Sequence, residues 1–163
     1  MNEIEHKHEV VRPNLNFTTP TNFVSRIHLK NGIKKEPLDI YVQEFETPIL
    51  SKGYATRKKG NKELLIPSTT ETKTPLTLNY VCDNEFYAYT DILDIFHGKT
   101  ELERIDHFLT DEDDYGIVVL SYHDPIIVNI GSLSFDLKND GMTTVTFPVE
   151  IIYSDFNHQR ITS

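Results

Sequence analysis

The chain has 163 residues, of which 38% are hydrophobic and 10% aromatic, a composition typical of one folded domain and not of a disordered segment. Its formal net charge of −9 argues against a protein that grips nucleic-acid phosphates, because that task needs clustered Lys and Arg. The single cysteine, Cys82, excludes an internal disulfide and a Cys-rich metal site, and its place at the end of an apolar run predicts a half-buried core residue.

The first third of the chain predicts an arm followed by two strands. Residues 1–21 are polar and contain two prolines, so we expect an arm ahead of a domain over residues 22–156. The first residues are too polar for a secretory signal, and no apolar run approaches the roughly 20 residues of a membrane-spanning helix, which predicts a soluble chain made inside a cell. Strands are predicted at Phe23–Leu29, which ends at an Asn-Gly turn signal, and at Leu38–Phe45.

Residues 50–66 differ in composition from the rest of the chain, because five cations come before any acid. A Lys-Gly-Asn turn lies between two extended stretches, which predicts a hairpin that projects from the body. The cations are candidates for contacts between subunits, and a solvated hairpin is the alternative. They are Lys52, Arg57, Lys58, Lys59 and Lys62. The Ser/Thr/Pro-rich residues 67–74 predict a loop.

The middle of the chain predicts a strand and the one convincing helix. Residues 75–82 alternate cleanly between apolar and polar side chains, as a half-buried strand does. A helix is predicted over residues 85–97, capped by Asp83 or Asn84 and ended by Gly98. Its expected apolar stripe consists of Phe86, Tyr89, Leu93 and Phe96, with Ile92 on the flank.

Residues 99–114 predict an acidic loop or a short second helix. The segment ends in four consecutive acids, which form a candidate acidic contact loop complementary to the basic hairpin, with a solvated loop as the alternative. These acids are Asp111, Glu112, Asp113 and Asp114.

Three strands are predicted in the last third of the chain. They cover residues 116–122, residues 126–130 with a continuation towards 133–137, and residues 143–153 after an Asn139-Asp140-Gly141 turn. Pro148 predicts a bulge or an edge position in the last strand, and residues 157–163 are expected to be a tail. The fold class is therefore mainly β, an antiparallel sandwich or barrel with one amphipathic helix and a projecting hairpin.

The local motifs for chemistry are weak. His6 and His8 have ligand-like spacing but no third ligand nearby, and the acids 111–114 lack the glycine and distal Glu of a calcium loop. Ser132 does not lie in a nucleophile elbow, and His97 is expected to interact with the last carbonyls of the helix. No catalytic residue, metal site or cofactor is predicted.

Several segments together resemble the tail tube proteins of contractile-tailed bacteriophages, over residues 20–156. One is the junction from strand to helix at Val81-Cys82-Asp83-Asn84-Glu85, with the helix ending in Phe96-His97-Gly98. Another is the Ile130-Gly131-Ser132-Leu133 segment before the turn and the long final strand. The chain departs from the family in having no Trp at the helix end or at the C-terminus.

The resemblance implies a structural protein of the virion tail and not an enzyme. It implies hexameric rings, stacked into a tube in the host cytoplasm, around a channel for the tape-measure protein and then DNA. The implied partners are other copies of the chain and the tail sheath, tape-measure and baseplate proteins, with no membrane. The acidic net charge suits such a conduit, because a lumen that repels phosphate lets DNA slide.

Two alternatives stay open. The first is a baseplate tube-initiating or tail-end subunit of the same fold. The second is a small β-sandwich that binds sugar or peptide, with Tyr87, Tyr115 and Tyr122 as an aromatic platform.

Overall fold

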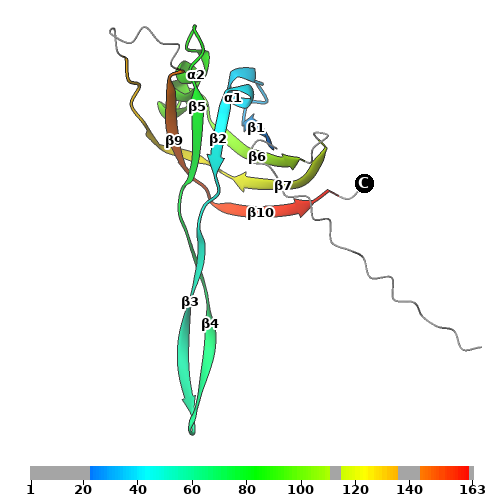
Figure 1. The fold of residues 1–163 in the computed structure, drawn as a ribbon, viewed down its shortest axis with the longest axis vertical. Helices are drawn as coiled ribbons and strands as arrows, with labels where there is room; N and C mark the ends of the chain where they lie inside the picture. The colour runs from blue at the N-terminus through cyan, green and yellow to red at the C-terminus, as the bar shows by residue number, and fades with distance from the viewer. Residues whose placement is uncertain (1–22, 111–114, 136–143, 162–163) are drawn as a thin grey trace, which may run out of the picture.

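A computed structural model describes residues 23–110, 115–135 and 144–161, and this described part contains ten strands and two helices (Figure 1). The predicted arm, the four acids at 111–114 and the Asn139-Asp140-Gly141 turn lie outside the described residues. The elements in chain order are β1 Phe23–Leu29, α1 Glu36–Ile40, β2 Val42–Glu46, β3 Leu50–Lys59, β4 Lys62–Lys73, β5 Leu76–Val81, α2 Tyr87–Phe96, β6 Leu102–Thr110, β7 Gly116–His123, β8 Ile126–Ile130, β9 Thr146–Ile152 and β10 Asp155–Arg160.

The strands form two four-stranded sheets and a separate hairpin. Sheet A has the order β1-β6-β7-β10, sheet B has the order β2-β5-β9-β8, and all pairings are antiparallel. The strands of the two sheets cross at a large angle in Figure 1, and β3 and β4 extend away from both sheets as one ribbon. The predicted fold class, antiparallel and mainly β with a projecting hairpin, is confirmed.

The core lies between the two sheets and under the helices. Alternate residues of β5 and β9 are buried, so that sheet B turns one apolar face inward. Sheet A contributes Ile105 and Tyr122 from the other side, and α2 adds Ala88, Ile92 and Ile95. The two helices therefore close the core at the end that the sheets leave open.

The predicted helix is present as α2, but it begins two residues later than predicted, its N-cap is Phe86 and not Asp83 or Asn84, and it buries a different face. The Asp83 carboxylate accepts the N–H of Tyr87 at 2.8 Å, and Gly98 takes a positive φ of 77° just after the helix. As expected, His97 contacts a late carbonyl of the helix, that of Leu93, at 2.8 Å from its Nδ1.

The predicted apolar stripe is rotated away from the core, since Phe86 and Phe96 are 36% and 47% exposed. Two faces of this helix satisfy the spacing of three and four residues, and the sequence pattern does not choose between them. The face that contains the small Ala88 is buried, because a small side chain lets the helix approach the strands closely.

The predicted strand at Leu38–Phe45 begins as helix α1. Pro37 lies in the first turn, where its missing N–H costs nothing, and the fully buried Leu38 points into the core. The Asp39 carboxylate accepts the N–H of Ile27 at 2.7 Å, which ties the helix to β1. The alternation of Leu38 and Ile40 imitates a strand, but Ile40 is 67% exposed.

Three predicted loops or tails are strands. Residues 102–110 form β6 in the middle of sheet A, residues 67–73 belong to β4, and residues 157–160 belong to β10. The charged residues of β6 are the reason that a loop was predicted, but in the structure they form hydrogen bonds with neighbouring residues. Asp106 accepts hydrogen bonds from Arg104 Nε at 3.0 Å and Ser121 Oγ at 2.7 Å, and its carboxylate lies 2.9 Å from His28 Nε2.

Pro148 lies on the internal strand β9, and the bulge is on its neighbour β8. The carbonyl of Pro148 accepts the N–H of Gly131 at 2.7 Å, just after β8 ends, so the missing N–H of Pro148 also faces this side. A Cβ at Gly131 would lie 2.5 Å from the proline ring. Glycine is therefore required there, and the predicted continuation of the strand stops, since residues 131–135 are not a strand.

Candidate functional site

The hairpin β3–β4 is the most exposed part of the described chain. Its ladder runs from Leu50 opposite Lys73 to Lys59 opposite Lys62, and its strands have 10 and 12 residues. Nearly all of these residues are exposed, including Tyr54 at 73% and Leu65 at 69%. An isolated two-stranded ribbon that exposes large apolar side chains needs a partner surface to become ordered and covered.

The register of the hairpin separates its side chains into two chemically different faces. The cationic face consists of Ala55, Arg57, Lys59, Lys62, Leu64 and Ile66, and the neutral face consists of Tyr54, Thr56, Lys58, Glu63, Leu65 and Pro67. Arg57 lies opposite Leu64, whereas Lys58 lies opposite Glu63, so the second face has a cation matched by an acid. The ladder thus brings three of the five predicted cations together, while Lys52 lies farther back, opposite Glu71.

The base of the hairpin is fixed to sheet B. Thr74 donates its N–H to the Ile49 carbonyl at 3.1 Å, and its hydroxyl accepts the N–H of Ile49 at 2.8 Å. Lys73 donates to the Ser154 carbonyl at 2.8 Å, and its ammonium lies 4.6 Å from the centre of the Tyr153 ring. These contacts set the direction in which the hairpin leaves the body.

The outer face of sheet B is acidic. Glu44, Glu46 and Glu150 point outward, where register pairs them with Asn79 and Thr77. The four strands of this sheet contain no Lys, Arg or His, whereas those of sheet A carry both charge signs. Sequence analysis missed this face, although the spacing of Glu44 and Glu46 is the signal of two acids on one side of a strand.

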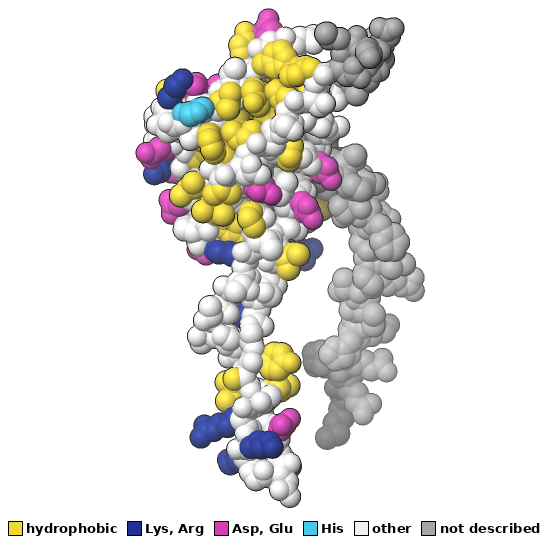
Figure 2. All heavy atoms as spheres, turned by 90° about the vertical axis from the view of Figure 1, so that its left-hand side faces the viewer, with side chains coloured by type: hydrophobic (Ala, Val, Ile, Leu, Met, Phe, Trp, Pro, Cys, Tyr) yellow, Lys and Arg dark blue, Asp and Glu magenta, His cyan; other side chains and the backbone are white. Residues whose placement is uncertain are grey.

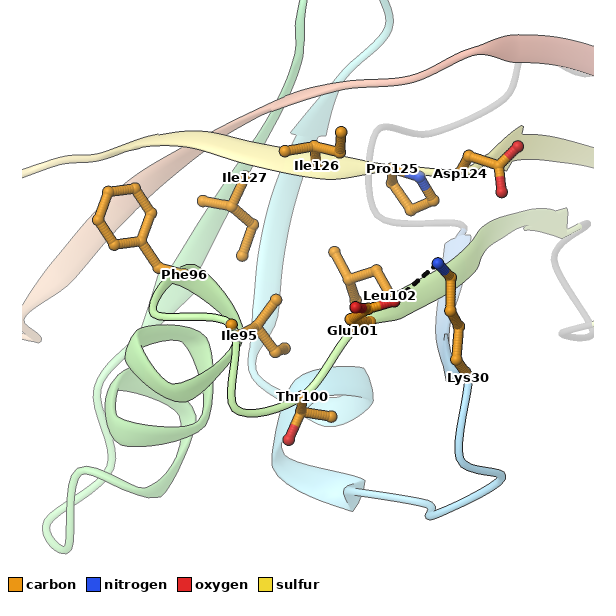
Figure 3. A pocket seen from close by; sticks show the side chains of 11 residues that line it. Lys30, Ile95, Phe96, Thr100, Glu101, Leu102, Asp124, Pro125, Ile126 and Ile127 are labelled. Carbon is orange, nitrogen blue, oxygen red and sulfur yellow. Dashed lines mark hydrogen bonds and ion pairs between the residues drawn. The ribbon is translucent and has the colours of Figure 1, made fainter.

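A pocket of about 360 Å³ opens between the end of α2 and the start of β8 (Figure 3). Its apolar lining comes from Ile95, Phe96, Leu102, Pro125, Ile126 and Ile127. At one end, the Lys30 ammonium donates to the Glu101 carboxylate at 2.7 Å. Besides Glu101, the negative charges of Asp124 and Glu103 also favour the charged form of Lys30 and so raise its pKa. Glu101 holds the pKa of Lys30 above its ordinary value, and Lys30 in turn lowers the pKa of Glu101.

The surface near this pocket is also apolar. Figure 2 shows hydrophobic side chains gathered over the body and a second group on the hairpin beside Lys and Arg. The exposed residues of α2, β8 and β9 include Phe96 at 47%, Ile126 at 60% and Ile152 at 44%. Such a surface marks an interaction site more often than single scattered apolar residues do.

The buried residue His107 gives the fold a pH dependence. His107 is fully buried, its Nδ1 lies 2.8 Å from the Ser25 hydroxyl, and its ring stacks on Phe45 with 4.1 Å between centroids. Burial lowers the pKa of His107 from 6.5 to about 4, against the opposing effect of Asp106.

We expect the folded state to lose stability as the pH falls from 6.5 towards 4. In this window His107 of the unfolded chain binds a proton, whereas the buried imidazole of the folded chain stays neutral. The stability that the neutral His107 contributes is therefore fully present above pH 6.5 and is lost as the pH falls towards 4. The loss is at most about 3 kcal/mol. Urea unfolding at several pH values should show a smaller loss over this window for His107→Asn, which keeps a partner for Ser25; an equal loss in both proteins would contradict the prediction.

The remaining predicted sites divide into those that the structure describes and those that it does not. Among the described residues no three His, Cys, Asp or Glu side chains gather as a metal site, and no helix in these ranges is long and apolar enough to cross a membrane. His6, His8 and the acids 111–114 lie outside the described residues. Tyr122 is fully buried, so it does not form an exposed aromatic platform with Tyr87 and Tyr115.

Comparison with known proteins identifies the fold. No family model matches the chain, and no curated protein matches it in sequence. A chain of the anti-feeding prophage tube-terminating cap superposes with a TM-score of 0.71 at 12% identity, covering 95% of this chain and 99% of that one. A chain of the baseplate of the same prophage gives 0.70 at 13% identity, covering 89% and 97%.

A third structure is the sheath–tube complex of an extracellular contractile injection system, with a TM-score of 0.67 at 13% identity, covering 88% of this chain and 92% of the other. At these identities the likeness is one of fold. The chain therefore has the fold found in the tube, cap and baseplate assemblies of contractile injection systems, as the resemblance to tail tube proteins implied.

Proposed function

We propose that this chain is a tube subunit of a contractile, phage-tail-type injection machine, and that it forms hexameric rings stacked around a channel. The observation that carries this proposal is the hairpin, whose two long strands bury almost nothing within their own chain. A ribbon of this kind is covered when it reaches a second subunit. The fold shared with contractile injection assemblies supports the same conclusion.

The rings would close through the edges of sheet B. The strands β2 and β8 lie at the two edges of this sheet, and an edge strand has backbone donors and acceptors without a partner on its outer side. Pairing β2 of one copy with β8 of the next satisfies these groups and repeats around a closed ring. The result is one continuous barrel.

The acidic face of sheet B would then line the channel. Its three outward carboxylates and its lack of cations repel phosphate, so DNA can pass without binding. The tape-measure protein would occupy the same channel before DNA, and the sheath would cover the outside of the tube.

A second candidate is a baseplate or tube-end subunit of the same kind of machine. It is favoured by the likeness to chains of a baseplate and of a tube-terminating cap. The two candidates differ in whether the chain polymerises without limit or adds only a ring to an existing tube.

The test is negative-stain electron microscopy of the purified chain, with the mass measured alongside. We expect rings or tubes with a central channel. Isolated rings that never stack would favour the baseplate or tube-end candidate. A chain that stays monomeric at high concentration, even with an added baseplate or tube seed, would refute both.

A further inference from the structure

We propose that the cationic face of the hairpin of one copy docks in the pocket between α2 and β8 of another copy. This inference rests on the proposed function and specifies the two surfaces that meet. The contact lies on one face of the hairpin, and the carboxylates that pair with its cations lie at the rim of the pocket.

The cationic face offers aliphatic side chains with cations directly beside them. Leu64 and Ile66 are 47% and 45% exposed and lie two residues apart on β4, so they point to the same side. Arg57 lies opposite Leu64 across the ladder, and Lys59 and Lys62 follow towards the tip. This face carries three cations and no acid.

The pocket offers the complementary chemistry. Its walls are aliphatic and aromatic, and the charged side chains that line it are two acids, Glu101 and Asp124, and one cation, Lys30, which leaves an excess of negative charge there. An aliphatic side chain can fill the apolar part while an adjacent cation reaches the carboxylates. The neutral face of the hairpin has no such match, because its Lys58 already lies opposite Glu63.

The occupant must come from a second copy. In Figure 1 the hairpin extends away from the body that contains the pocket, and its base is fixed in that direction by Lys73 and Thr74. Nucleic acid is unsuited to the pocket, because phosphate would meet its carboxylates. Complementary charge on two apolar surfaces favours both the association rate and the register of the contact.

The test is a charge reversal on the hairpin with a matched control one residue away. Arg57→Glu is expected to lower the amount of sedimentable tube about tenfold, whereas Lys58→Glu, with the same change in net charge, should lower it less than about twofold. The second substitution Glu101→Lys, added to Arg57→Glu in one chain, should restore most of the assembly. The three replaced side chains are exposed, and so is Lys30, the ion-pair partner of Glu101, so far-UV circular dichroism melts should stay unchanged.

Two results would overturn the inference. Equal losses for Arg57→Glu and Lys58→Glu would show that the hairpin acts only by its total charge, and an absent rescue by Glu101→Lys would place its contact elsewhere. In both cases wild-type tubes would still form, so the proposed function would stand. Failure of the wild-type chain to assemble at all, even with a seed, would overturn the inference and the proposed function together.

Discussion

Replacing Phe147 by alanine is expected to lower the free energy of unfolding by about 3–5 kcal/mol, the usual cost of removing a buried aromatic side chain. Phe147 is fully buried on β9 and lies opposite Tyr80 in the β5 ladder. Its ring centroid is 5.6 Å from that of Tyr80 and 5.1 Å from that of Tyr89 on α2. The alanine would therefore leave a cavity where sheet B meets the helix that closes the core.

Urea unfolding of the two proteins at the same pH measures this difference. A single domain is stabilised by about 5–15 kcal/mol, so the variant should be close to the limit of folding. Phe135→Ala is the matched control, because this phenylalanine is 65% exposed and should change the free energy by less than about 0.5 kcal/mol. Similar losses for both substitutions would contradict the placement of Phe147 at the centre of the core.

The sequence predicted the strands that turn one apolar face towards the core. The strand β1 has the predicted bounds, and β5 and β7 differ from prediction by a residue at their ends. In β1 and β5 apolar and polar side chains alternate, so their period of two is visible in a single sequence, whereas β7 is recognised by its continuous apolar run Ile-Val-Val-Leu. The same argument failed for β6, because Asp106 and His107 are buried in it on opposite faces. Their partners come from β1 and β7, which no local pattern can show.

The helices show a second limit of prediction from sequence. In α1, Leu38 and Ile40 alternate as strand residues do, and only the contact of Asp39 with β1 distinguishes the two structures. In α2, the burial of one apolar stripe over the other depends on which face meets the strands. Tertiary packing decides both cases, and intrinsic propensity is too small to override it.

The candidate surfaces were predictable in kind but not in arrangement. The basic composition of residues 50–66 predicted the hairpin, but only the register separates Arg57 from Lys58. The pocket joins Lys30, which follows β1, to residues of α2, β6 and β8 that are far apart in the sequence, so Asp124 and Lys30 gave no local signal. Glu101 lies at the other end of the segment 99–114 from the four acids predicted to form a contact, and the contact of those acids remains a prediction.

Replacing residues 51–72 by Asn-Gly is expected to abolish tube formation while leaving the body folded. The ends of the hairpin are already close, since Leu50 pairs with Lys73 and Thr74 donates to Ile49 at 3.1 Å, so a two-residue turn can join them. The removed residues contribute no buried side chain to the core, and the thermal midpoint should therefore change little. If the ribbon joins rings as we propose, its loss should lower the sedimentable fraction at least about tenfold.

The control for this deletion is Ile33→Ser, which removes an apolar side chain that is 56% exposed in the turn after β1 and should leave tubes intact. Electron microscopy shows at which step assembly of the variant fails. Rings that form but do not stack would place the hairpin between rings, because the edges of sheet B, which we propose close each ring, remain in the variant. Tubes of normal length from the deletion variant would refute any role of the hairpin in stacking, and would leave the edges of the sheets as the surfaces on which assembly depends.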